Sequence, residues 1–363
     1  MDLQLTVFEW LINNGVNNDN NDGNVENMVA NGRNMRRSSR ILRPIINWFD
    51  LCSDAQFQSR FRLCKLDVLY MLERIEGPLR HLTEKNNAIP PIIQLLVAIR
   101  FYAAGCFLIT VGDFCGISKA SAHTIVHRVS PLIASLGNEF IKFPSTEEEL
   151  KRTAGLNFQQ AGCPRAIGAI DCIHIRIQSY GGDDAELFRN RKGFFSINVQ
   201  VIMNSELEIL DIVARWPGSV HDATIFNNSR IKARFESGEF GNYVLLGDSG
   251  YPNLSYMMTP LQNPQTPSEA LYNEAQIKSR CMVEKCFGIW GRQFAILTKG
   301  SRFVKPETTL CVIICTAVLY NIMRRRNRQI SRYNIENIEG DNNDALHDNE
   351  RKWLIDNYFQ CLI

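Results

Sequence analysis

Four acidic side chains stand where a carboxylate is either costly or close to a possible ligand. Asp171 lies inside the apolar run AIGAIDCIHIRI, Asp222 in WPGSVHDATIF, Asp248 at the end of YVLLGDSG, and Glu284 in RCMVEKCFGIWG. Buried carboxylates need a partner, and Mg²⁺ or Mn²⁺ favours oxygen ligands of this kind. Two such ions about 4 Å apart can hold both oxygens of a phosphodiester displacement. The four acids are therefore candidate ligands of a phosphoryl-transfer metal site.

Each acid also has an ordinary structural interpretation. Asp248 could be a turn residue, because aspartate bonds locally to turn backbone. Asp222 could be the N-cap of the helix that follows it, and this role can coexist with metal binding. Asp171 could pair with an arginine inside the sheet, and Glu284 could sit at a helix edge with its head in water. No GxSxG, P-loop or HExxH motif offers a competing chemistry.

Strands are expected to position two of the acids. AIGAIDCIHIRI and SINVQVIM alternate with period two, which places Asp171 on one face with Ile173 and Ile175. LEILDIVARWPG predicts a third strand and YVLLGDSG a fourth, with Asp248 at its end. Strands joined by short connections and followed by helices indicate a mixed α/β layer fold.

Helices are expected to carry the other two acids. ATIFNNSRIKARFESG predicts one helix after Asp222, and two more follow in residues 273–297 and 306–327. On the helix of residues 273–297 we expect Glu284 in the middle of a buried stripe. That stripe comprises Ile277, Cys281, Glu284, Phe287, Gly288, Gly291 and Phe294.

The N-terminal half is predicted to be helical and to contain a helix-turn-helix-like segment. In FLITVGDFCGISKASAHTIVHRVSPLI a helix ends near Phe114, the chain turns at Gly116, and a second helix opens at Ser118. Lys119 near its start could contact DNA, although plain helix packing gives the same pattern. His123 and His127 are expected on an exposed polar face rather than at a metal.

The chain of 363 residues is expected to divide into four parts. Residues 1–45 form a disordered, asparagine-rich and then basic segment ending in MRRSSRILR, a phosphate-contacting or nuclear-import patch if it is more than a solvated run. Residues 46–150 form the helical domain, residues 155–330 the α/β domain, and residues 331–363 an acidic tail.

Composition restricts the class of protein. Hydrophobic residues make up 45% and charged residues 21% of a chain with net charge +2, which predicts a globular protein whose nucleic-acid contacts must be local. The 11 cysteines include no CxxC pair and several lie in apolar runs, which indicates reduced, buried, intracellular cysteine. We expect no signal peptide, and no apolar run long enough to span a membrane.

The motifs in order resemble the DDE transposases of the PIF/Harbinger superfamily, including the nucleases that animals have domesticated from Harbinger transposases. The likeness runs from about Asn87 to Asn327, and 35 residues separate Asp248 from Glu284, as this family typically has. It implies an RNase H-like mixed sheet flanked by helices. By this likeness Asp171, Asp248 and Glu284 are the catalytic acids, and Asp222 matches an additional metal-ligand position.

The resemblance implies further features of the chain. FRNRKGFFSIN matches a basic stretch after the first strand, so that Arg189, Arg191 and Lys192 are candidate phosphate contacts. Tyr320 stands where the family usually has histidine, and Ile173 where threonine is common; neither change touches a carboxylate. The family typically works with a separate Myb-like DNA-binding protein that aids nuclear entry.

The expected function is therefore a nuclear, metal-dependent DNA endonuclease of transposase origin, which also occurs in the cytoplasm. It would use Mg²⁺ or Mn²⁺, with water or a DNA 3′-hydroxyl as the attacking group. The alternatives are a domesticated transposase that binds DNA or a partner without cutting, and a phosphohydrolase acting on small substrates. The sequence leaves the DNA target and the oligomeric state open.

Overall fold

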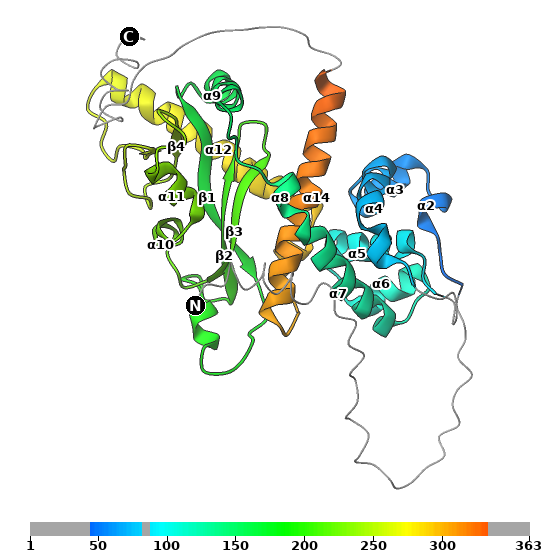
Figure 1. Cartoon of the computed structure of the whole chain (residues 1–363). Coiled ribbons are helices and arrows are strands. Elements are labelled where there is room, and N and C mark those ends of the chain that lie inside the picture. Colours follow the sequence, from blue (N-terminus) through cyan, green and yellow to red (C-terminus); the bar gives the residue numbers. More distant parts are fainter. Residues whose placement is uncertain (1–43, 82–87, 333–363) are drawn as a thin grey trace.

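The computed structural model describes residues 44–81 and 88–332, with side chains up to residue 326 (Figure 1). The asparagine-rich segment, the patch MRRSSRILR with its arginines and the acidic tail lie outside the described residues. The predictions made for those three segments therefore stay predictions.

The N-terminal half is helical, as the sequence predicts. Its helices are α2 (Trp48–Leu51), α3 (Asp54–Phe61), α4 (Lys65–Leu79), α5 (Pro91–Ala104), α6 (Leu108–Cys115), α7 (Lys119–Ser135) and α8 (Gly137–Phe140). Local signals set several boundaries. Ser53 and Gln56 form a capping box that starts α3, and Pro91 occupies the first position of α5.

The segment predicted as helix-turn-helix-like consists of α6, a tight turn and α7. Gly116 adopts a left-handed conformation with φ of 72°, and a side chain there would collide with the carbonyl of Pro44. Ser118 caps α7 by accepting a hydrogen bond from the Ser121 amide at 3.0 Å. Lys119 is the first residue of α7 and is exposed. These contacts explain the helical hairpin, and DNA contact by it stays a prediction.

His127 corrects the expectation of an exposed histidine pair on α7. His123 is exposed, but His127 is half-buried, with its ring centroid 5.5 Å from that of Phe303 and 4.2 Å from that of His123. Burial, aided by the nearby charges of His123 and Lys305, lowers the pKa of His127 to about 4. The sequence pattern of α7 alone could not show that a segment far along the chain packs on this ring.

The C-terminal half is built on a mixed sheet of five strands. They are β1 (Ala166–Arg176), β2 (Ser196–Met203), β3 (Ile209–Pro217), β4 (Val244–Leu246) and β5 (Met257–Met258), in the order β3-β2-β1-β4-β5. β1, β2 and β3 are antiparallel neighbours, whereas β4 runs parallel to β1 and to β5. This mixed sheet with flanking helices is compatible with the RNase H-like fold, and β5 is an addition to the four expected strands.

Helices cover both faces of the sheet (Figure 1). One apolar core joins odd-numbered β1 and β2 residues such as Ile175 and Val201 to α5, α12 (Pro267–Gln293) and α14 (Pro306–Arg332). A second core joins even-numbered residues such as Ile170 and Ile202 to α10 (Asp222–Asn227) and α11 (Arg230–Glu236). The remaining helices are α9 (Glu147–Ala161) and α13 (Ile296–Lys299). The side chains that alternate along β1 and β2 thus point into two different cores, one on each face of the sheet.

The helix expected after Asp222 is two helices in the structure. α10 ends at Asn227, and Ser229 starts α11 by accepting a hydrogen bond from the Lys232 amide at 3.3 Å. Ser229 is a good N-cap residue, and this local preference outweighs the continuous apolar spacing that suggested one helix.

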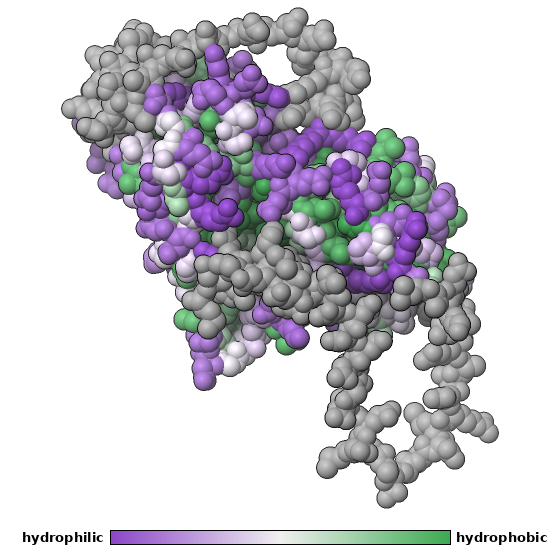
Figure 2. Space-filling view, in the orientation of Figure 1, coloured by the Kyte–Doolittle hydropathy of each residue, from purple (hydrophilic) through white to green (hydrophobic). Residues whose placement is uncertain are grey.

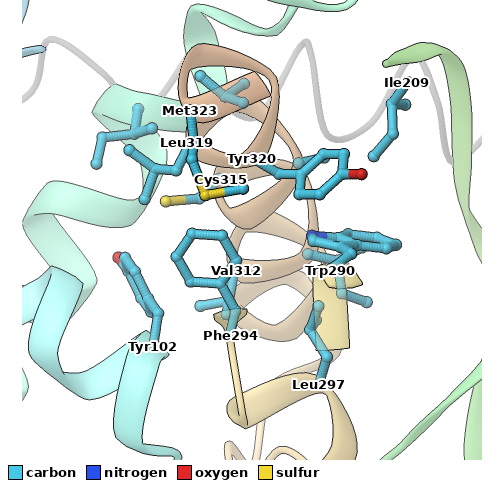
Figure 3. Packing of buried hydrophobic residues seen from close by; sticks show 14 of the residues in the cluster. Tyr102, Ile209, Trp290, Phe294, Leu297, Val312, Cys315, Leu319, Tyr320 and Met323 are labelled. Carbon is cyan, nitrogen blue, oxygen red and sulfur yellow. The ribbon is translucent and has the colours of Figure 1, made fainter. Parts of the chain in front are cut away.

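α14 connects the two halves, because it packs against both α7 and β3. Figure 3 shows Tyr320 of α14 beside Trp290 of α12, with Phe294, Cys315 and Tyr102 of α5 in the same cluster. The Tyr320 hydroxyl, at the position where the resembling family usually has histidine, lies 3.2 Å from the Cys286 thiol. The substitution is therefore absorbed by the core.

Within the residues that the structure describes, the segment Pro306–Arg326 of α14 is long and apolar enough to cross a membrane by length and composition. The expectation that no run reaches that length is therefore wrong. Most of the segment is buried between α7 and the sheet, which explains its apolar character without a membrane. Figure 2 shows a mainly hydrophilic surface in this view, with apolar patches over the helical half; exposed Leu51, Leu66 and Leu69 belong to that half.

Candidate active site

Strand register brings Asp171 and Asp248 together. Ala169 of β1 pairs with Leu246 of β4 in parallel register, and each aspartate lies two residues further along its own chain segment. β4 ends at Leu246, so Asp248 leaves the sheet beside Asp171. Both aspartates line one pocket with Arg280 of α12. The pocket is lined by Ala169, Ile170, Asp171, Leu246, Gly247, Asp248, Pro260, Gln276, Ile277, Arg280 and Val283.

The ionisation of Asp171 is perturbed by its surroundings. Its pKa is raised to about 6, chiefly by burial and then by the negative charges of Asp248 and Asp222. A hydrogen bond from the Cys172 amide to Asp171 Oδ1, at 2.7 Å, and the positive charge of Arg280 partly oppose this rise in pKa. The protein thus holds a half-buried carboxyl group in a negative environment, which a divalent cation would relieve.

Asp248 does form the turn that its sequence context suggested. Its Oδ1 accepts a hydrogen bond from the Gly250 amide at 2.9 Å, and its carbonyl oxygen accepts one from the Tyr251 amide at 3.2 Å. The side chain is half-buried and faces the pocket that contains Asp171. The turn role and the ligand role are therefore compatible, because the turn uses a single side-chain oxygen.

Asp222 approaches from the other face of β1. It is the first residue of α10, and His221 holds the N-cap position, so the N-cap interpretation is wrong. The Asn198 side-chain amide donates to Asp222 Oδ1 at 2.8 Å and to the Val220 carbonyl at 2.9 Å. The Cys172 thiol, on the even-numbered face of β1, lies 3.4 Å from the Tyr251 hydroxyl, and the charge of Asp222 helps to raise its pKa, behind the main effect of burial. Asp222 is close enough to raise the pKa of Asp171, but the two side chains extend from different faces.

Glu284 corrects the expected buried stripe of α12. Its side chain is 61% exposed and forms an ion pair with Arg280, one turn earlier, at 3.4 Å. The buried residues of α12 are Ser268, Tyr272, Ala275, Gln276, Ser279, Val283, Cys286, Trp290 and Gly291. Of the predicted stripe, Gly291 and Phe294 are therefore buried. The apolar pattern misled because Gln276 and Ser279 are turned inward, where they bond to the Tyr272 hydroxyl and the Ala275 carbonyl. Ile277 is 60% exposed.

The donor set suits a hard divalent cation. Asp171 and Asp248 share the pocket, Asp222 acts on it through β1, and Glu284 lies at its rim beside Arg280. In the part of the chain that the structure describes, no three His, Cys, Asp or Glu residues already form a metal-binding group. Oxygen donors from carboxylates are the ligands of Mg²⁺ and Mn²⁺, and a half-buried Asp171 carboxyl group near two further aspartates fits such an ion.

Comparisons with known proteins concern the part of the chain that contains these four acids. Residues 170–321 match the family model described as a DDE superfamily endonuclease. A human protein with the name "Putative nuclease HARBI1" is 31% identical over 275 residues, which cover 75% of this chain and 78% of that protein. The chain belongs to the Harbinger-type DDE superfamily endonucleases. The rat protein of the same name is 32% identical with the same coverage, and "Protein ALP1-like" of Arabidopsis thaliana is 23% identical over 74% of this chain and 70% of its own length. No solved structure matches the chain.

DDE superfamily endonucleases generally depend on divalent metals, and the matched region of this chain contains all four acids. Sequence reasoning did not identify Arg280 as a site residue. The signal was its position four residues before Glu284, which places both on one side of a helix. It also missed Asn198, whose polar side chain is buried in β2 and holds Asp222.

The predicted phosphate contacts of this Harbinger-type chain differ in their environment. Arg189 is paired with Glu186 at 2.7 Å and bonds to the Gly193 carbonyl at 3.0 Å. Arg191 is exposed and contacts the His221 ring, next to Asp222. Lys192 is exposed, and both Arg191 and Lys192 lower the pKa of His174 in β1, behind the main effect of burial. The loop is thus near the Asp222 side of β1.

Proposed function

We propose that this chain is a divalent-metal-dependent DNA endonuclease that cuts phosphodiester bonds, with Asp171, Asp248 and Glu284 as its catalytic acids. The observation that carries this proposal is the parallel register that sends Asp171 and Asp248 into one pocket at the end of β4. The pKa of Asp171, raised by burial and then by the charges of Asp248 and Asp222, supports it, because a buried carboxyl group near other acids is costly unless a cation binds there.

When bound, Mg²⁺ or Mn²⁺ ions would act as Lewis acids that stabilise the charge developing on the phosphate and its two reacting oxygens. Asp171 and Asp248 would hold them from the sheet. With its pKa at about 6, Asp171 is ionised and able to bind a cation at pH 7 and above. Glu284 is exposed and would turn from Arg280 toward the pocket to complete the site. Asp222, held by the hydrogen bond from Asn198, would add a further ligand or, without binding the ion, a further negative charge that attracts it.

A basic loop beyond the pocket favours DNA over a small phosphate ester. The exposed cations Arg191 and Lys192 lie near the Asp222 side of β1, where they could contact the backbone of a long substrate. The human and rat relatives carry the name "Putative nuclease HARBI1", which supports a nucleic-acid substrate. Competition of duplex DNA against a small phosphodiester for the wild-type enzyme would decide between the two substrates.

The test is cleavage of supercoiled plasmid with Mg²⁺ or Mn²⁺ by the wild type and by Asp171→Asn, Asp248→Asn and Glu284→Gln. We expect nicked or linear product with the wild type alone, and no product with EDTA. Since the three acids act as one unit, each single variant should lose nearly all activity, and a double variant should lose little more. Cleavage by Asp248→Asn at the wild-type rate would overturn the assignment.

A second candidate is a transposase-derived protein that binds DNA or a partner without cutting. The pairing of Glu284 with Arg280 favours it, because Glu284 is not among the residues that line the pocket with the two aspartates. This candidate predicts DNA binding by the wild type without any change in melting temperature on addition of Mg²⁺ or Mn²⁺.

For either candidate we propose that the chain works in the nucleus, also occurs in the cytoplasm, and cooperates with a Myb-like DNA-binding protein. Imaging of the tagged chain with and without such a partner would test both statements. Exclusion from the nucleus in the presence of the partner would contradict them.

A further inference from the structure

Among the residues that the structure describes, Arg280 is the one cation in the lining of the acidic pocket. It projects from α12 beside Asp171 and Asp248 and pairs with Glu284 at 3.4 Å. It also lowers the pKa of Asp171, opposing the effect of burial, and is the positive charge that acts on this carboxyl group. Arg280 therefore pairs with one acid of the site and shares the pocket lining with two others.

The guanidinium of arginine stays protonated at all ordinary pH values. It therefore places a permanent positive charge where a divalent ion would sit or pass. Arg280 and Glu284 are four residues apart on one helix, so their ion pair forms without any long-range folding contact. Both side chains are more than half exposed, at 58% and 61%, which leaves them free to change rotamer.

We propose that Arg280 is the internal counter-ion of the metal-free site, and that it holds Glu284 at the rim until a divalent metal displaces it. The inference rests on the proposed function and concerns the regulation of the same site. Arg280 is in this sense a positioning residue, because it acts through Glu284 and through the charge of the pocket. Metal entry then requires the Arg280–Glu284 pair to open.

Two consequences follow for the free energy of metal binding. The cation must overcome repulsion by Arg280, and Glu284 must leave its ion pair before it can bind the ion. An exposed ion pair contributes up to about 1 kcal/mol, which corresponds to about fivefold in an equilibrium constant. Removing the charge of Arg280 should therefore tighten metal binding, although most substitutions in a binding site weaken it.

The experiment measures Mn²⁺ affinity of the full chain by isothermal titration, for the wild type, Arg280→Gln, Arg280→Lys and Lys285→Gln. We expect Arg280→Gln to bind Mn²⁺ about three- to tenfold more tightly. Arg280→Lys keeps the charge and should stay close to the wild type. Lys285→Gln is the matched control: it removes the same charge from the exposed residue next to Glu284, but it lies outside the pocket lining.

The melting temperature provides a second measurement. Without metal, Arg280→Gln should melt below the wild type because its carboxylates lose their counter-ion. In saturating Mn²⁺ the two proteins should melt at similar temperatures. If Arg280→Gln proves too unstable to titrate, ¹⁵N spectra of the wild type test the same idea: the Arg280 Nε–H signal, assigned by its loss in Arg280→Lys, should shift on addition of Mg²⁺.

The outcomes separate this inference from the proposed function. Wild-type binding with an unchanged or weaker affinity in Arg280→Gln would overturn the counter-ion role alone. An equal gain in Lys285→Gln would also overturn it, because the effect would then be general electrostatics. An Arg280 signal unmoved by saturating Mg²⁺ would do the same. Failure of all four proteins to bind Mn²⁺ would overturn the proposed function, and this inference with it.

Discussion

Asp171 and Asp248 line the same pocket, and each lies two residues beyond a residue of the parallel β1–β4 pairing. Those two residues, Ala169 and Leu246, are partners in the register of the strands. One aspartate continues along β1 while the other leaves the sheet in a turn. The sheet itself therefore sets their proximity, and no long side chain has to reach across. Loss of either charge is the most direct perturbation of the candidate metal site.

Asp248→Asn is expected to remove the response to metal while leaving the fold intact. Asparagine keeps the size of the side chain and a carbonyl oxygen that can accept the Gly250 amide, so the turn should persist. The metal-free variant should melt at or slightly above the wild-type temperature, because one carboxylate of a crowded set is neutral.

Thermal melts with and without Mg²⁺ or Mn²⁺ measure this effect. Once the metal concentration exceeds the dissociation constant, the melting temperature of the wild type should rise with the logarithm of that concentration. The melting temperature of the variant should not change. Asp54→Asn, which removes an exposed charge from α3, serves as the control and should keep the full metal response. A wild type with no thermal shift would show that Asp248 is a turn residue without a metal role.

His127 should make stability depend on pH, independently of the metal site. Its pKa is about 4 in the folded protein and about 6.5 unfolded, because burial disfavours the charged ring. The unfolded chain therefore binds the proton first as pH falls. The stability that neutral His127 provides is present above pH 6.5 and is lost between about pH 6.5 and pH 4.

Urea unfolding of the wild type and His127→Gln at several pH values, from about 7.5 down to about 4.5, would measure this. As pH falls, the free energy of unfolding of the wild type should decrease relative to that of His127→Gln, because glutamine has no proton to bind. His123→Gln should retain most of the pH dependence, since burial, rather than the charge of His123, is the larger cause of the low pKa. A pH-independent difference would contradict the assignment.

Local sequence signals predicted some elements well for clear physical reasons. The boundary between α6 and α7 depends on Gly116, which the left-handed turn requires, and on Ser118, which caps the next helix. Both effects act within a few residues, so the sequence displays them. The alternation in β1 and β2 was equally informative, because period two assigns the side chains to two faces.

The orientation of α12 could not be predicted in the same way. Counting apolar residues placed Glu284 inside, whereas the helix buries Gln276 and Ser279, whose polar atoms are satisfied by Tyr272 and Ala275. The error was about a third of a turn, and it depends on hydrogen bonds that a hydropathy pattern does not contain. For the same reason Arg280 was overlooked, although it lies in the pocket and Glu284 at its rim.

The three basic residues Arg189, Arg191 and Lys192 are expected to contribute unequally to the salt dependence of DNA binding. Arg189 is already paired with Glu186, whereas Arg191 and Lys192 are exposed with no acidic partner within ion-pair distance among the described residues. The slope of log K against log salt is negative for DNA binding. Replacing Arg191 and Lys192 together by alanine should reduce the magnitude of this slope by about 0.9 for each phosphate that the variant no longer neutralises. Arg189→Ala should change it less.

Fluorescence anisotropy with a duplex of random sequence, at several salt concentrations, gives these slopes. Equal slopes for the wild type and the Arg191, Lys192 double variant would remove the loop from the DNA path. An effect of Arg189→Ala as large as that of the double variant would show that DNA breaks the pair with Glu186.

Lys119 tests whether the hairpin of α6 and α7 touches DNA. It is the exposed first residue of α7, where the helix N-terminus also favours an anion. Lys119→Ala should weaken binding by a similar factor on every duplex, because a phosphate contact carries no base information. Lys142→Ala, which removes an exposed lysine between α8 and α9, is the control for overall charge.

Competition among several duplexes distinguishes the outcomes. A changed order of preference would indicate direct reading of bases, and an affinity equal to that of the wild type would leave the hairpin with a packing role, because Gly116 and Ser118 already explain its shape.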